Sequence, residues 1–124
     1  MIYSHWSEIP ESAWPSRYFR PLEIACRGDG SIKIDAHALS CLDNLRSLLG
    51  RPIHLSSAYR SPYRNAACGG APKSSHLNGN AFDVQLRGHD KEEIRKVADR
   101  VGFKGMGLRY NSFIHLDTSR KRTW

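Results

Sequence analysis

The chain has few cysteines and no long apolar run. Its three cysteines are Cys26, Cys41 and Cys68, an odd number that cannot pair completely within one chain. No two of them form the C-x-x-C pair that is typical of a structural zinc site. Reduced and mostly buried thiols are the simplest account of them. Because no apolar stretch is long enough to cross a bilayer, the sequence predicts no membrane insertion.

The N-terminal residues lack the features of an export signal. Met1–Glu8 has neither a basic start nor an apolar centre, which predicts synthesis in the cytoplasm without a signal peptide. A length of 124 residues suits one compact domain with a single core. We therefore expect a monomeric, single domain over residues 1–124, in which residues 1–19 form an arm that covers the edge of the core through Trp6 and Trp14.

Acidic residues are fewer than basic ones. The chain has 19 Lys and Arg against 12 Asp and Glu, which gives a formal net charge of +7 and favours an anionic partner. The cations are scattered, and only residues 120–122 (Arg-Lys-Arg) form a block, which we interpret as a solvated tail or a contact with a wall polymer. A nucleic-acid site would favour a basic helix or interleaved aromatic residues. The sequence therefore predicts an acidic cell-wall polymer as partner, and no nucleic acid.

Hydrophobic periodicity predicts two long helices and several short strands. Leucines at helical spacing follow the N-cap residue Asp35 and predict a helix over Ala36–Leu49. A second helix is predicted between the N-cap residue Asp90 and Gly102. Shorter segments predict a helix over 63–68 and strands over 31–34, 52–57, 81–86, 103–110 and 113–118. This order predicts an α+β fold with a small, mainly antiparallel sheet packed by helices.

The stretch from Ser74 to Asp83 carries the strongest signal of chemistry. His76 and Asp83 lie seven residues apart across a Gly/Asn turn, which places His76 on a loop and Asp83 on the strand that follows. An imidazole nitrogen and a carboxylate oxygen are common Zn²⁺ ligands, and His115 in the last predicted strand offers a third. Three ligands would leave one tetrahedral position open for water, which is the arrangement of a catalytic zinc.

These residues resemble the motifs of a known family. The pattern Ser74-x-His76-x-x-Gly79-x-Ala81-x-Asp83 is similar to the S-x-H-x-x-G-x-A-x-D motif of the D-Ala-D-Ala carboxypeptidase family of zinc peptidases. That family includes carboxypeptidases, dipeptidases, phage endolysins and murein endopeptidases. Residues 57–62 resemble its S-x-Y-R-S-P segment, and residues 113–117 resemble its F-[VI]-H-[VIL]-D strand. The resemblance covers most of the chain and implies a D-Ala-D-Ala carboxypeptidase/hedgehog-like zinc fold.

The resemblance also implies roles for single residues. It implies peptide hydrolysis at a zinc ion, which lowers the pKa of its water to about 7 and polarises the scissile carbonyl. Arg60 matches the family arginine that holds the peptide carbonyl or carboxylate, a task that suits a charged bidentate fork. The implied zinc ligands are His76, Asp83 and His115.

The chain departs from much of the family next to the last ligand. Carboxypeptidase-like members carry an acidic residue three positions before that ligand, where this chain has Ser112. Phe113 likewise stands where some related enzymes have a second histidine. Asp117 is the best local substitute, since residues two apart on a strand share a face with each other and Asp117 therefore lies beside His115. Three roles stay open for it: the base, an orienter of His115, or a structural acceptor.

The sequence as a whole predicts a zinc-dependent peptidoglycan peptidase that hydrolyses murein stem peptides or cross-links. Small size, positive charge and the predicted lack of a signal favour a phage or prophage enzyme that the lysis machinery releases to the cell wall. Two alternatives stay open. The missing acid at Ser112 would suit a non-catalytic, zinc-stabilised module that binds wall peptides. A D-Ala-D-Ala carboxypeptidase or dipeptidase would instead release free D-alanine.

Overall fold

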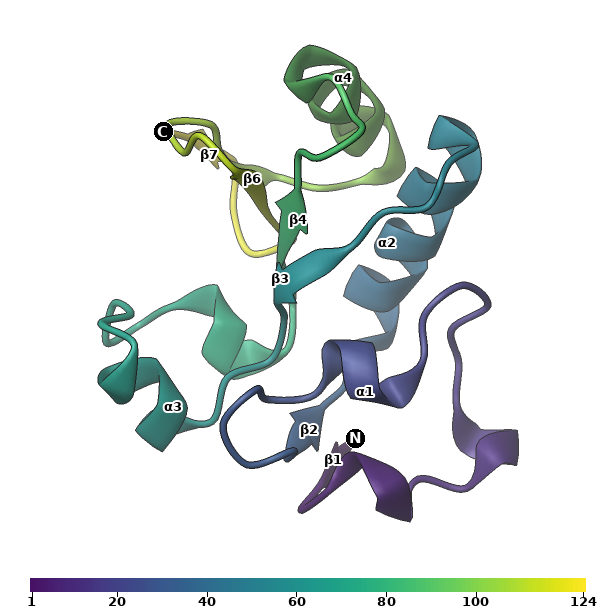
Figure 1. Cartoon of the computed structure of the whole chain (residues 1–124), viewed down its shortest axis with the longest axis vertical. Helices are drawn as coiled ribbons and strands as arrows, with labels where there is room; N and C mark the ends of the chain where they lie inside the picture. Colours follow the sequence, from purple (N-terminus) through teal and green to yellow (C-terminus); the bar gives the residue numbers. More distant parts are fainter.

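The computed structural model describes residues 1–124 and has an α+β fold (Figure 1). Its helices are α1 (Pro21–Ile24), α2 (Ala36–Leu49), α3 (Pro62–Ala67) and α4 (Lys91–Val101), with 3₁₀ turns η1 (Trp6–Glu8), η2 (Glu11–Ala13) and η3 (Ser75–Asn78). Its strands are β1 (Ile2–Tyr3), β2 (Ile32–Lys33), β3 (Leu55–Ser57), β4 (Ala81–Gln85), β5 (Gly105–Gly107), β6 (Phe113–Asp117) and β7 (Arg122–Thr123). The predicted fold class is confirmed.

The main sheet has five strands in the order β3-β4-β6-β5-β7. Every neighbouring pair is antiparallel except β5 and β7, which are parallel. The predicted strands over 52–57 and 103–110 shorten to β3 and β5, and β7 was not predicted at all. A separate two-stranded sheet pairs β1 with β2. The sheet is therefore mainly antiparallel, as predicted, with a parallel edge that comes from the end of the chain.

The two faces of the main sheet differ in chemistry. Successive side chains of a strand point to opposite faces, and in β4 and β6 one set is apolar. The core on that face contains Phe82, Val84, Ile114 and Leu116, all at most 1% exposed. Helices α2 and α4 pack against each other, whereas α3 lies on the far side of β3 from α2 (Figure 1). The other set includes Asp83, His115 and Asp117, and this side of the sheet is called the polar face below.

Local signals set the ends of α2. The Asp35 side chain accepts a hydrogen bond from the backbone N–H of Ala38 at 2.9 Å. Gly50 ends the helix in the left-handed conformation, with φ of 69°, which glycine adopts at little cost. The predicted helix is confirmed at both ends, and α4 likewise begins after Asp90 and ends at Gly102.

Asp35→Ala is expected to lower the free energy of unfolding by about 1 kcal/mol, because it leaves a helix N-terminal N–H without its side-chain acceptor. Urea denaturation followed by circular dichroism measures this loss. Asp35→Asn is the matched control, since asparagine caps helices about as well as aspartate. An alanine variant as stable as the asparagine variant would contradict the capping role.

In the N-terminal segment, Trp6 and Trp14 are partly buried against the core. Cys26 and Cys41 are buried, Cys68 is exposed, and all three are free thiols. No helix combines the length and the apolarity that crossing a bilayer requires.

Candidate metal centre

Three predicted ligand residues converge on the polar face of the sheet. Asp83 of β4 and His115 of β6 are directly opposite each other in the antiparallel register, and His76 comes from η3. Asp83 Oδ1 lies 3.2 Å from His76 Nε2 and 3.1 Å from His115 Nδ1. One ligand atom from each residue lies within 4.8 Å of the others. All three residues are buried, with exposures of 2%, 5% and 8% for His76, Asp83 and His115.

Backbone contacts set the orientation of His76. Its Nδ1–H donates to the carbonyl of Ala58 at 2.6 Å, which in the neutral imidazole leaves the lone pair on Nε2, the nitrogen that faces Asp83. The Ser74 hydroxyl accepts the His76 backbone N–H at 3.2 Å and so starts the turn. Gly79 ends it at φ of 74°, where an added Cβ would lie 2.5 Å from the Lys33 carbonyl oxygen. The Gly/Asn loop expected from the sequence is thus a short 3₁₀ turn that presents one imidazole nitrogen.

Asp117 sets the orientation of His115. The Nε2–H of His115 donates to Asp117 Oδ2 at 2.8 Å, so in the neutral imidazole the lone pair is on Nδ1, the nitrogen that faces Asp83. Asp117 is 0% exposed and also accepts the Ser119 backbone N–H at 3.0 Å and the Arg122 guanidinium at 3.2 Å. It does not line the cleft. Asp117 therefore lies behind the His115 ring, on the side away from the other two ligands.

Burial and hydrogen bonding act in opposite directions on the pKa values of this cluster. Burial by itself would raise the pKa of Asp83, but the imidazoles of His115 and His76 more than offset it and hold this pKa well below its ordinary value. Burial would lower the pKa of His115, yet Asp117 and Asp83 raise it. Burial would raise the pKa of Asp117, but His115 and the Ser119 N–H lower it. Both carboxylates are therefore ionised at neutral pH, the state that binds a cation or orients an imidazolium or imidazole.

The cluster lies at the base of an open cleft of about 530 Å³. Arg60 lies in its wall, with a side chain 18% exposed and a guanidinium 3.5 Å from Asp83 Oδ2. It also donates to Ser57 Oγ at 3.2 Å and to Asn65 Oδ1 at 3.3 Å. Asp83 is the sole acidic residue among those that line the cleft, whereas the cationic ones are Arg60, Lys73, Arg109 and Arg122. The cleft therefore presents positive charge around a single buried carboxylate.

The donor set fits a zinc ion. Two imidazole nitrogens and one carboxylate oxygen are ligands that Zn²⁺ commonly takes in proteins, and a catalytic zinc has three protein ligands with a further position for water or substrate. In each histidine the second ring nitrogen already donates to an oxygen, Ala58 O or Asp117 Oδ2. This is the outer contact that metal-binding histidines generally make. His76, Asp83 and His115 can thus hold the ion while the outer hydrogen bonds of both histidines, to Ala58 O and Asp117 Oδ2, stay in place.

The sequence analysis missed two residues beside this cluster. The Arg-Lys-Arg block at 120–122 was interpreted as a solvated tail or a contact with a wall polymer, but Arg122 belongs to β7 and its guanidinium contacts the buried Asp117. Trp124 was given no role, yet its ring lies 5.1 Å from that of His115. The alternation of Arg122 and Trp124 was the available signal, because residues two apart on a strand share a face. The pairing of β7 with β5 was not predictable from local sequence.

Comparison with known proteins identifies the family. The sequence model of the peptidase M15 family matches residues 17–117. Peptidoglycan L,D-endopeptidase MepK of Escherichia coli K12 is 36% identical over 99 residues, which cover 73% of this chain and 54% of MepK. The probable peptidoglycan L,D-endopeptidase MepK of Haemophilus influenzae is 31% identical over 101 residues, which cover 74% of this chain and 54% of that protein. The chain thus spans about half the length of the curated relatives it matches. These matches confirm the resemblance seen in the motifs, and the chain belongs to the peptidase M15 family.

Proposed function

We propose that the chain is a zinc-dependent peptidase that hydrolyses peptide bonds in the stem peptides or cross-links of peptidoglycan. The observation that carries this proposal is the convergence of His76, Asp83 and His115 in an open cleft. Membership of the peptidase M15 family supports the reaction class. The relatives described above are named as peptidoglycan L,D-endopeptidases, which supports both the substrate and endopeptidase action at an L,D bond.

The proposal assigns a role to each residue of the site. When bound by the three ligands, Zn²⁺ lowers the pKa of a coordinated water to about 7 and polarises a carbonyl. Arg60 binds the carbonyl or carboxylate of the substrate, because its mostly buried guanidinium is anchored by Ser57 and Asn65 beside the ligand cluster. Asp117 orients His115 from behind and is not the base, since its carboxylate is shielded from the cleft.

The charge of the cleft supports an acidic peptide as substrate. Lys73 and Arg109 line its wall together with Arg60 and Arg122, and the sole acidic residue there is Asp83, a proposed metal ligand. Cationic walls around a low-dielectric cleft raise the local concentration of anionic substrates. A stem peptide with free carboxylates satisfies these groups. A phage or prophage origin and a monomeric state stay predictions of the sequence.

A digest of purified muropeptides tests the proposal. The zinc-loaded protein is expected to release a new amine and shorter peptides, which mass spectrometry identifies. Chelation should stop the release and added Zn²⁺ should restore it. Free D-alanine as the only product would identify a carboxypeptidase or dipeptidase instead of an endopeptidase. A zinc-loaded, folded protein that releases no amine from any muropeptide would contradict peptidase activity.

One observation favours a second candidate function. The cleft contains no carboxylate besides Asp83, and Ser112 occupies the position of the acid that carboxypeptidase-like members carry. A protein with this site but without a separate base would suit a zinc-stabilised module that binds wall peptides and does not cut them. Retention of the zinc-loaded protein on intact murein, with no hydrolysis at any pH, would identify this function.

A further inference from the structure

Two glycines of β5 lie directly opposite the residues that form one side of the metal centre. In the antiparallel register Gly105 pairs with Asp117 and Gly107 pairs with His115. An added Cβ at Gly105 would lie 2.4 Å from Asp117 Oδ1, and one at Gly107 would lie 3.0 Å from His115 Cβ. The strand next to β6 therefore has no side chains on the polar face. Because β5 has no side chains here, side chains from the next strand, β7, can reach Asp117 and His115.

Side chains of Arg122 in β7 and of Trp124, which follows β7, fill this gap. Arg122 is the parallel partner of Gly105, and its Nη2 reaches Asp117 Oδ2 at 3.2 Å. Trp124 lies over Gly107, where an added Cβ would be 2.9 Å from Trp124 Cε2. The backbone N–H of Trp124 donates to the Met106 carbonyl at 3.0 Å, which holds this end of the chain against β5. Both side chains thus reach across a glycine to the residues of β6.

Arg122 and Trp124 also contact each other and enclose His115. The Arg122 guanidinium lies 4.4 Å from the centre of the Trp124 ring, a cation–π distance. The Trp124 ring is 5.1 Å from the His115 ring, and its Nε1–H donates to the Tyr110 hydroxyl at 3.2 Å. These contacts form a continuous layer behind and beside the His115 imidazole, whose Nδ1 stays on the side of Asp83.

We propose that Arg122 and Trp124 are positioning residues for the metal ligand His115. Arg122 compensates the buried charge of Asp117 and holds its carboxylate in line with His115 Nε2, while Trp124 restricts rotation of the imidazole. The inference rests on the proposed zinc site. Both residues follow the stretch 17–117 that the family model matches, so the family match by itself assigns them no role.

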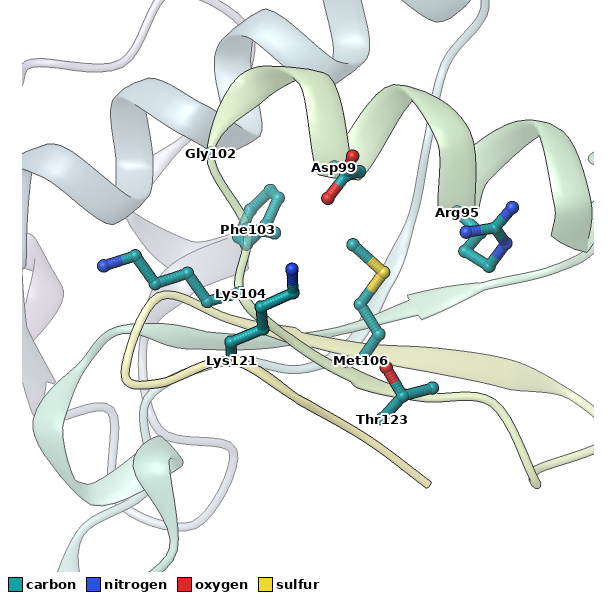
Figure 2. A pocket seen from close by; sticks show the side chains of 8 residues that line it. All are labelled: Arg95, Asp99, Gly102, Phe103, Lys104, Met106, Lys121 and Thr123. Atoms are coloured by element: carbon teal, nitrogen blue, oxygen red, sulfur yellow. The ribbon is translucent and has the colours of Figure 1, made fainter.

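The opposite face of β7 supplies matched controls. Lys121 and Thr123 alternate with Arg122 and Trp124 and line a separate pocket with Met106 and Asp99, on the side of the sheet that carries α4 (Figure 2). Lys121→Met changes the net charge as Arg122→Met does, and Thr123→Val leaves it unchanged as Trp124→Leu does. Both controls lie in or next to β7 and line the separate pocket, not the metal centre. A loss specific to Arg122 and Trp124 would therefore come from the metal centre and not from general loosening of β7.

The test measures zinc affinity by competition with a chromophoric chelator, together with the visible spectrum of the Co²⁺-substituted protein. Arg122→Met is expected to weaken Zn²⁺ binding roughly tenfold, the lower end of the effect of outer contacts on metal sites. Arg122→Lys should recover part of this loss because it keeps the charge, and Trp124→Leu should weaken binding in the same direction. Both Arg122→Met and Trp124→Leu should alter the Co²⁺ spectrum. Lys121→Met and Thr123→Val should leave affinity and spectrum unchanged.

The positioning role of Arg122 and Trp124 can be overturned independently of the peptidase proposal. Thermal unfolding of the metal-free variants establishes that each is folded. If Arg122→Met is not folded, the affinity and spectrum of Arg122→Lys are compared with the wild type in its place. Wild-type affinity and an unchanged Co²⁺ spectrum in both the arginine and the tryptophan variants would overturn the inference while leaving the peptidase proposal intact. Equal losses in the Lys121 and Thr123 controls would also overturn it. A wild-type protein that binds zinc but cuts no muropeptide would overturn the peptidase proposal alone, and one that binds no zinc would overturn both.

Discussion

His76→Ala is expected to lower peptidase activity about a thousandfold or more. The substitution removes one of three proposed ligands, and without the ion the chain has no group that lowers the pKa of water from 15.7 to about 7. The zinc content of the purified protein, measured by mass spectrometry, should fall together with the release of amine from muropeptides. His76 is 2% exposed, with its ring between Ala58 O and Asp83, so the loss cannot be replaced by a neighbouring side chain.

A second histidine controls for the loss of an imidazole. His54 is exposed and precedes β3, and His54→Ala is expected to keep wild-type zinc content and activity. Unfolding of metal-free His76→Ala separates loss of the ligand from loss of the fold, because the unsatisfied Ala58 carbonyl alone costs about 1–3 kcal/mol. A folded His76→Ala protein that retained stoichiometric zinc and full activity would rule out His76 as a ligand.

Asp117→Asn is expected to weaken zinc binding about 10- to 100-fold, the range found when the outer partner of a metal-binding histidine is lost. The asparagine amide is close in shape to the aspartate carboxylate. It carries no negative charge to pair with the Arg122 guanidinium, and it accepts a weaker hydrogen bond from His115 Nε2. At saturating Zn²⁺ the variant should keep most of its kcat. Chelator competition gives the affinity, and a zinc titration of muropeptide hydrolysis gives the kcat.

The same variant separates the orienting role of Asp117 from the base role. Removal of a general base costs about 10²- to 10⁴-fold in rate and leaves metal affinity in place. Full zinc affinity with such a loss of kcat would therefore identify Asp117 as the base, against the geometry that buries it behind His115. Asp90→Asn is a suitable control, because asparagine caps a helix about as well as aspartate does and Asp90 lies at the start of α4.

The sequence predicted elements whose ends depend on local chemistry. The helix over Ala36–Leu49 was predicted at both ends because an aspartate N-cap, a leucine stripe and a terminal glycine all act within the helix itself. Strands were less well predicted. The segment 103–110 contracts to Gly105–Gly107, since strand length depends on partners that lie far away in the sequence.

The candidate ligands were also predictable, because their identities follow from the chemistry of zinc and from motifs with defined spacing. The role of Asp117 was not. Strand periodicity places Asp117 on the same face as His115, which leaves open whether its carboxylate points into the cleft or behind the imidazole. Only the packed structure decides this, through the contacts of Asp117 with Ser119 and Arg122.

The amino-acid sequence by itself therefore determined the fold class and the long helices, because caps and periodicity act through neighbouring residues, and it predicted the three candidate ligands from the chemistry of zinc and from motif spacing. The tertiary structure alone decided which ring nitrogen of each histidine faces the site, where Asp117 lies, and that β7 reaches over Gly105 and Gly107 to His115. These features depend on hydrogen bonds and packing between segments that are distant in the chain, and no local pattern encodes such pairings uniquely.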